Sequence, residues 1–207
     1  MADVLPEVQG GAGPQEVAPV ILVDSAGALY KALTNAELTA ALAGSAALAA
    51  AATQRATFVD YAPVLDTTQY AASDVLSETT EIANFFRANG VGGMLISLQV
   101  VDRDKEANDD MVVYFLDANV SVGSRNAAEG MDDADVDHIL AKVAINNTTD
   151  WTTMANHKIA QLGALNRILK PAADSRSLFV AIICGSTGTR TYTAATDIRL
   201  KIGVVLD

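Results

Sequence analysis

Residues 58–76 read FVDYAPVLDTTQYAASDVL, and they separate two parts of the chain that differ in composition. Before this stretch, proline, glycine and alanine dominate segments with few large apolar side chains. After it, apolar runs of strand length recur between polar turns, which is the pattern of a β-rich domain. We therefore predict a β domain over residues 56–207, preceded by an N-terminal arm and an Ala-rich linker or helix over residues 1–55.

Composition limits the classes of partner that the chain can bind. Its 207 residues give room for one domain of ordinary size and an extension. It carries 25 acidic against 14 basic residues, and the net charge of -11 repels phosphate backbones and anionic lipids. We therefore expect neither nucleic acid nor a membrane as a partner. The single cysteine, Cys184, excludes an internal disulfide, and its apolar neighbours predict an inert, buried thiol.

The N-terminal part is predicted to gain its order from a partner. Residues 1–18 carry too little apolar surface to offset the entropy of ordering, so we predict an extended arm. The Ala-rich residues 36–54 fit either a helix capped by Asn35 or an extended linker, and their apolar window 38–52 is shorter than the ~20 residues that span a bilayer. The apolar side chains spaced along the arm are the predicted partner-binding residues, namely Val4, Leu5, Val8, Val17, Val20, Ile21 and Leu22.

Period-2 patterns predict the strands. The first is residues 58–64, which a proline and a polar turn bring to an end. In residues 94–101 the alternation places Met94, Ile96, Leu98 and Val100 on one face. Residues 111–116 form its predicted partner, because the polar loop 102–110 has the length that joins two antiparallel strands.

Further along the chain, one segment changes period. Residues 132–143 repeat apolar side chains at helical spacing behind a cluster of acidic residues, which predicts one short helix. Residues 159–169 fit helix or strand, and we favour strand. Residues 178–184 form a nearly continuous apolar run, and residues 198–206 alternate. About seven to nine strands with no βαβ rhythm predict a mainly β fold, an antiparallel β-sandwich or jelly roll; parallel α/β is the alternative.

No pattern in the sequence identifies a reaction. The acidic residues of loop 102–110 fit a hard-cation site or a solvated hairpin loop, and we favour the loop. The spacing of Asp133, Asp135 and Asp137 imitates a calcium loop, but helix capping explains it better. His138 and His157 are too few and too far apart for zinc. We predict no catalytic, cofactor-binding or metal-binding residue, no cofactor and no enzyme activity. Trp151 fits a core anchor or an interface residue.

Short motifs from residue 65 onward resemble those of a known group of proteins. The group is the structural proteins of tailed bacteriophage virions, which includes small proteins made near the major capsid protein. The resemblance does not cover residues 1–56, and residues 71–73 replace a pattern that is richer in glycine. The motifs are Leu65-Asp66-Thr67-Thr68-Gln69-Tyr70-Ala71, Asp74-Val75-Leu76, Thr80-Glu81-Ile82, Phe115-Leu116-Asp117-Ala118-Asn119, Asp133-Ala134-Asp135, Ser177-Leu178-Phe179-Val180 and Leu200-Lys201-Ile202-Gly203.

The resemblance implies a virion component without a catalytic motif. One expectation is a capsid decoration (cement) protein: a homotrimer on the outer capsid surface that binds the major capsid protein, with the arm along capsid subunits. The alternative is a tail-fibre or baseplate module that recognises a host glycan. Aromatic residues make up 5% of the chain, which counts against a glycan groove.

Overall fold

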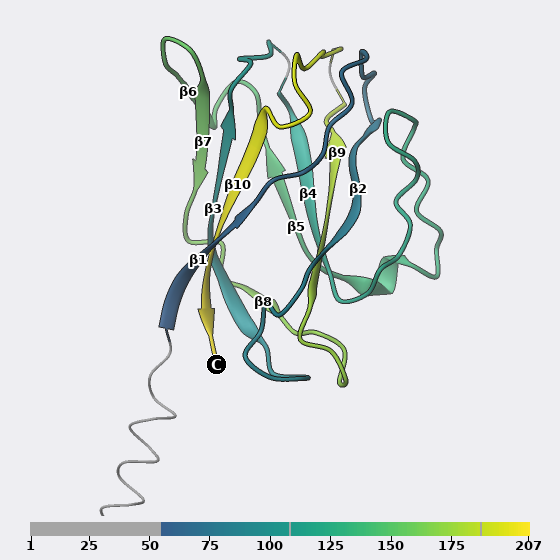
Figure 1. The fold of residues 1–207 in the computed structure, drawn as a ribbon, viewed down its shortest axis with the longest axis vertical. Helices are drawn as coiled ribbons and strands as arrows, with labels where there is room; N and C mark the ends of the chain where they lie inside the picture. The colour runs from purple at the N-terminus through teal and green to yellow at the C-terminus, as the bar shows by residue number, and fades with distance from the viewer. Residues whose placement is uncertain (1–54, 108, 187) are drawn as a thin grey trace, which may run out of the picture. The chain divides into compact units, whose positions relative to one another are not determined.

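The computed structural model describes residues 55–107, 109–186 and 188–207. In this part, two antiparallel sheets pack face to face, with β6, β7, β3 and β10 on one side of Figure 1 and β5, β4, β9 and β2 on the other. The six-stranded sheet has the order β1-β10-β3-β7-β6, with β8 also paired to β3, and the four-stranded sheet has the order β2-β9-β4-β5. The strands are β1 (Arg55–Tyr61), β2 (Val75–Ile82), β3 (Gly93–Asp102), β4 (Met111–Leu116), β5 (Ile139–Ile145), β6 (Trp151–Thr153), β7 (Lys158–Leu162), β8 (Arg167–Leu169), β9 (Leu178–Cys184) and β10 (Ile198–Leu206).

This topology is a jelly roll, which confirms the predicted fold class. The first strand pairs with the last, β2 pairs with β9, and β1 to β4 alternate between the two sheets. Every pair of named strands in the described residues is antiparallel, so the α/β alternative is wrong. The predicted strand at residues 159–169 is confirmed as two short strands, β7 and β8.

The core lies between the sheets, where the apolar side chains of both inner faces meet. In β10, Ile198, Leu200, Ile202 and Val204 are all buried, as their alternation predicts. The run in β9 is continuous because both faces of that strand are covered. Ala181 and Ile183 point away from the core and belong to a second buried cluster with apolar side chains from the segment 117–131.

The helix predicted over residues 132–143 is wrong. A 3-10 helix, η1, covers only Val136–His138, and β5 follows it at once, paired with β4. In β5 the buried residues are Ala141, Val143 and Ile145, which is period 2. Pairing with β4 decided the structure over the helical spacing, as tertiary context does for a short segment. The capping explanation is wrong as well, because Asp135 makes no side-chain cap hydrogen bond.

The face predicted for β3 is half wrong because the ladder shifts register. Opposite β10, Ser97 pairs with Gly203, but Leu95 pairs with the next residue, Val204, so Ile96 is the extra residue of a β-bulge. Leu98 and Val100 point into the core as predicted. Before the bulge the alternation reverses, so that Leu95 is buried and Met94 is exposed.

The prediction that loop 102–110 closes a hairpin is also wrong. β3 and β4 lie in different sheets, so this loop crosses from one sheet to the other. It belongs to the loop end of the sandwich, which we define as residues 102–107, 109–110, 146–157, 185–186 and 188–197 and which lies at the top of Figure 1. The other end, where β1 begins and β10 ends, is called the C-terminal end.

Candidate binding surface on the open sheet face

The acidic loop is not a solvated hairpin loop. Asp102 and Asp109 are fully buried at the loop end. The Asp102 carboxylate accepts hydrogen bonds from the backbone N–H groups of Asp104 and Glu106, both at 2.8 Å. This carboxylate therefore fixes the path of the loop. Among the described residues, no group of three or more His, Cys, Asp or Glu is placed to hold a metal ion.

Two buried cations accompany these carboxyl groups. Lys158 Nζ lies 2.6 Å from Asp109 Oδ2 and donates a hydrogen bond to the carbonyl oxygen of Glu106. The same ammonium lies 5.0 Å from the centroid of the Trp151 ring, whose Nε1–H donates to the carbonyl oxygen of Asp109. Trp151 is therefore a partly buried anchor of the loop end. Arg190, also buried, donates from Nη1 to the carbonyl oxygen of Asp110.

Burial controls the protonation of this end of the molecule. Desolvation, with Asp102 as the next cause, raises the pKa of Asp109 to about 8. Desolvation also raises the pKa of the Cys184 thiol to about 11 and that of the Tyr192 hydroxyl well above its ordinary value. The thiol stays protonated and unreactive near neutral pH, as its sequence context predicted. We therefore assign the loop end a structural role.

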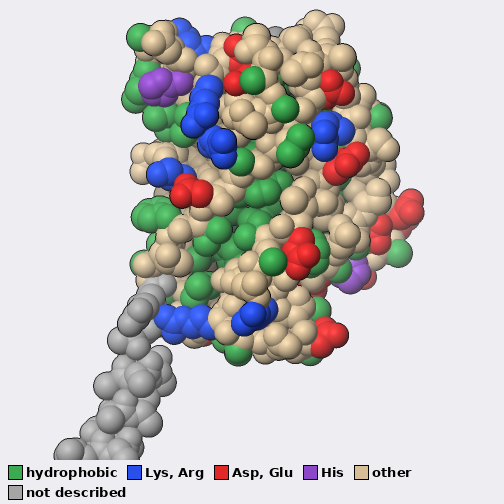
Figure 2. Space-filling view, in the orientation of Figure 1, with side chains coloured by type: hydrophobic (Ala, Val, Ile, Leu, Met, Phe, Trp, Pro, Cys, Tyr) green, Lys and Arg blue, Asp and Glu red, His purple; other side chains and the backbone are tan. Residues whose placement is uncertain are grey.

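The outer face of the six-stranded sheet has a different character, because it is open in the described part of the chain. Phe58 is 68% exposed on β1, Met94 is 37% exposed on β3 and Ile168 is 75% exposed on β8. Figure 2 shows hydrophobic side chains gathered in a hollow on the face that it presents, with charged side chains spaced around the hollow. Clustered exposed apolar side chains mark a binding surface more often than isolated ones do.

The β-ladders arrange the outward side chains of this face in rows. At the C-terminal end, Ile168, Met94 and Val205 are direct partners on three adjacent strands. They line a hollow of about 500 Å³ together with residues 90–93, Lys170 and Asp207. We call the row of Ile168, Met94 and Val205 the apolar end.

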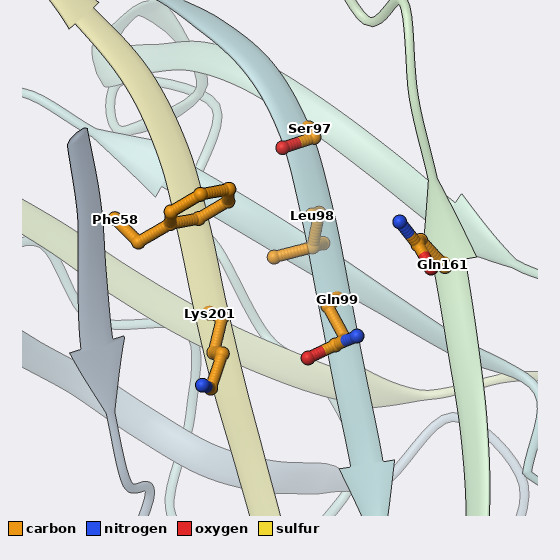
Figure 3. Close-up of a pocket in the computed structure, with 6 residues that line it drawn as sticks. All are labelled: Phe58, Ser97, Leu98, Gln99, Gln161 and Lys201. Atoms are coloured by element: carbon orange, nitrogen blue, oxygen red, sulfur yellow. The ribbon is translucent and has the colours of Figure 1, made fainter. Parts of the chain in front are cut away.

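The next rows, beyond the bulge, carry polar groups. Phe58 and Ser97 are both partners of Gly203, and Gln99 is the partner of both Lys201 and Gln161. A hollow of about 290 Å³ lies among them, and we call it the polar hollow; its lining is Phe58, Ser97, Leu98, Gln99, Gln161 and Lys201. Figure 3 shows the Phe58 ring reaching from β1 across β10 toward Ser97, with Gln99 and Lys201 beside it and Gln161 facing them from β7.

Gly203 makes the polar hollow possible. A Cβ at this position would lie 2.1 Å from Ser97 Oγ and 3.0 Å from Cε1 of Phe58. Both groups therefore occupy the space over a residue without a side chain. The register shift lies at the same residue, and on the Ser97 side of it the alternation keeps Leu98 in the core and places Ser97 and Gln99 on the outer face, as the sequence pattern predicts.

None of these surface residues was among the sites predicted from the sequence. The predicted partner-binding residues, between positions 4 and 22, and the Ala-rich residues 36–54 lie outside the described residues, and the domain division at residue 55 stays a prediction. The signal for the new surface was present in part: β10 alternates apolar with polar residues, so its sheet has one outward face. The residues that complete this surface come from strands far apart in the chain. The bulge also exchanges the positions expected for Met94 and Leu95, so that Met94 faces outward.

Comparisons with known proteins identify no family. No family model and no curated protein matches the chain. The K3 cleaved adhesin domain of Lys-gingipain from Porphyromonas gingivalis W83 aligns at 16% identity and a TM-score of 0.28, over 72% of this chain and 74% of that one. A structure of Desmodium yellow mottle tymovirus aligns at 8% identity and a TM-score of 0.26, over 98% and 94% of the two chains. A structure of a marine algae virus of the order Picornavirales aligns at 12% identity and a TM-score of 0.23, over 100% of this chain and 84% of that one. This weak similarity to virus structures and an adhesin domain carries no argument about function.

Proposed function

We propose that this protein is a structural component of a tailed bacteriophage particle. In this proposal it decorates the outer surface of the capsid by binding the major capsid protein, and it has no catalytic role, no cofactor and no nucleic-acid or membrane partner. The observation that carries the proposal is the apolar end, where Ile168 and Met94 stand side by side and exposed on a sheet face. Among the described residues, no helix has the length and hydrophobicity needed to span a bilayer.

The chemistry of the apolar end suits a protein surface. Ile168, Met94 and Val205 carry no charge, although the chain as a whole has a net charge of -11. Burying such side chains contributes roughly 25 cal/mol per Å² of apolar surface, with no ionic group to desolvate in the row itself. Lys170 and Asp207 also line the hollow, so it combines apolar with charged side chains, as protein interfaces do.

The position of the apolar end fits the predicted arm. Arg55 pairs with Leu206 at the C-terminal end of the sheet, next to the row. The covalent connection to residues 1–54 is therefore at the same end of the domain as the exposed row. In the proposal, the apolar arm residues between positions 4 and 22 add contact area on capsid subunits.

The test is binding to purified phage particles that lack this protein. Full-length protein and the variant Ile168→Asp are mixed with the particles, and the bound fraction is measured after sedimentation. The charge would be buried without a partner at the contact, so we expect a loss of affinity of roughly tenfold or more. Val136→Asp is the matched control, because it places the same charge on another exposed apolar residue, in η1. Binding of Ile168→Asp at the wild-type level would overturn the proposal.

The proposed oligomer is a homotrimer, since decoration of a symmetric capsid favours a closed, symmetric assembly. Its mass would be about three times the 21.6 kDa of the chain. Light scattering of the purified protein measures this mass directly. A monomer that persists at high concentration contradicts the trimer and leaves the binding test above unaffected.

The alternative is a tail-fibre or baseplate module involved in host attachment. One observation favours it: the exposed Phe58 ring shares a hollow with the polar side chains of Ser97, Gln99 and Gln161 and with one cation, Lys201, which is an arrangement suited to a glycan. Antibody labelling of purified particles distinguishes the two positions. Label over the capsid shell supports decoration, and label confined to the tail supports attachment.

A further inference from the structure

We infer that the polar hollow binds a sugar ring, specifically a neutral pyranose unit of a glycan. The inference concerns residues other than those of the apolar end, and it holds whether the protein lies on the capsid or on the tail. It rests on four features of the hollow: an exposed aromatic ring, polar side chains that make no hydrogen bond to the described residues, a single charged residue in the lining, and a size that fits one ring.

The aromatic ring is the first feature. Phe58 is 68% exposed on the edge strand β1, and its ring lies over Gly203, which has no side chain to cover it. A pyranose carries C–H bonds on one face and hydroxyl groups around its rim. The C–H face packs on the electron-rich face of an aromatic ring, and both surfaces leave water when they meet.

The polar side chains are the second feature. Ser97, Gln99 and Gln161 line the hollow, and none of these side chains hydrogen-bonds to another group in the described residues. A glutamine amide and a serine hydroxyl both donate and accept hydrogen bonds. The hydroxyl groups of a sugar do the same, so that each amide can bond two of them at once. Side chains that serve the fold, such as Asp102 at the loop end, have their partners within the protein.

Charge selects a neutral sugar. Lys201 is the one charged residue in the lining of the hollow, and its ammonium lies 4.0 Å from the carboxylate of Asp60 on the neighbouring strand. An anionic sugar would therefore meet one cation whose charge is already shared, on a chain with a net charge of -11. A neutral pyranose is not repelled by the negative charge of the chain.

Size limits the ligand to one ring at a time. The hollow measures about 290 Å³, at the lower end of the volumes of small-molecule sites, and it is open to solvent on the outer face. A single ring of about a dozen heavy atoms would bind with a Kd on the order of 1 mM. Several copies on one particle would raise the apparent affinity for a polymer of such rings.

The experiment is saturation-transfer NMR on the full-length protein with four neutral probes, the methyl glycosides of glucose, galactose, mannose and N-acetylglucosamine. We expect at least one probe to receive magnetisation, with the strongest transfer at the C–H protons of one ring face. Phe58→Ala and Gln99→Leu should each lower the affinity by roughly tenfold. Phe58→Trp should retain or strengthen binding, because it keeps an aromatic face.

Two controls keep the test specific. Ile168→Ala removes an exposed apolar side chain from the same sheet outside the hollow, and it should leave sugar binding unchanged. Thermal unfolding of each variant checks that the fold is intact, which the exposure of Phe58 leads us to expect. The proposal is overturned if no neutral probe binds, if binding survives in Phe58→Ala, or if only the charged probes glucuronic acid and sialic acid bind.

Discussion

The loop end and the open sheet face combine a lysine with an aromatic ring, and they use the pair in opposite ways. At the loop end, Lys158 is buried over Trp151, with its Nζ 2.6 Å from an oxygen of Asp109. On the sheet face, Lys201 is exposed and lies 4.0 Å from an oxygen of Asp60, while the Phe58 ring beside it faces solvent. The buried pair supports the fold, and the exposed pair is the one that we propose contacts a ligand.

The reason is the cost of leaving a polar group unpaired. In a buried site this cost is several kcal/mol for a charge, so every carboxyl and cation there needs a partner within the protein. On a surface, water satisfies the same groups at almost no cost, so Gln99 and Gln161 stay free to bind something else. The two regions can be separated experimentally by their effects on stability and on binding.

The largest effect is expected from Lys158→Met. At about pH 9, above the raised pKa of Asp109, this change leaves a buried carboxylate without its cation, so we expect a loss of about 3 kcal/mol or more in the free energy of unfolding. Urea denaturation measures it. Lys201→Met is the matched change on the sheet face, and it should cost less than about 0.5 kcal/mol because an exposed pair contributes little. Equal costs would contradict the contrast between the two regions.

The loop end should also make stability depend on pH. The pKa of Asp109 is raised to about 8 in the folded protein, from 3.8 as its ordinary value. Between these two pKa values the folded protein holds a proton on Asp109 that the unfolded chain releases. The contribution of this proton to the free energy of unfolding is therefore complete below pH 3.8 and is lost as the pH rises toward 8. We expect a slope of at most about 1.4 kcal/mol per pH unit, seen by urea unfolding between about pH 5 and pH 8. Asp109→Asn cannot release the proton and should flatten the curve; a stability that rises over this range contradicts the assignment.

Gly203→Val tests the link between the fold and the polar hollow. The new side chain would collide with Ser97 and with the Phe58 ring, so we expect a loss of about 1 to 3 kcal/mol in stability and a filled hollow that no longer binds sugar. Thermal unfolding and the NMR titration check the two effects. Gly163→Ala is the matched control: an added Cβ there has no atom within 4 Å, and stability should change by less than about 1 kcal/mol.

The smallest effect on stability is expected on the open face itself. Phe58→Ser and Ile168→Ser remove exposed side chains, so each should change the free energy of unfolding by less than about 0.5 kcal/mol. The two variants should differ in whether they lose sugar binding or particle binding. Phe58→Ser should lose sugar binding and keep particle binding, and Ile168→Ser should do the reverse. A loss of both activities in one variant would show that the two hollows act as one site.

Part of this architecture was predictable because local pattern and final environment agree. In β10 the residues that the alternation predicts to be buried are buried, namely Ile198, Leu200, Ile202, Val204 and Leu206. Cys184 lies in an apolar run and is buried. The helix at residues 132–143 was mispredicted because Val143 suits both a helical face and the inner face of a strand. The partner strand β4, which decides between them, is a feature of the fold as a whole.

The amino-acid sequence by itself determined the class of fold, since alternating apolar residues can be buried in only one way once two sheets face each other. It also determined the acidic character of the chain and the burial of its thiol. Only the tertiary structure decided which polar side chains have hydrogen-bond or ion-pair partners within the described residues and which remain exposed to solvent. Loop 102–110 looks like solvated surface until β3 and β4 enter different sheets and draw Asp102 and Asp109 inside. Ser97 and Gln99 look like ordinary strand residues until the pairing of β1, β10, β3 and β7 places Phe58 and Gln161 beside them. Both outcomes depend on pairings between residues far apart in the chain, and a one-residue shift in such a pairing exchanges inside for outside.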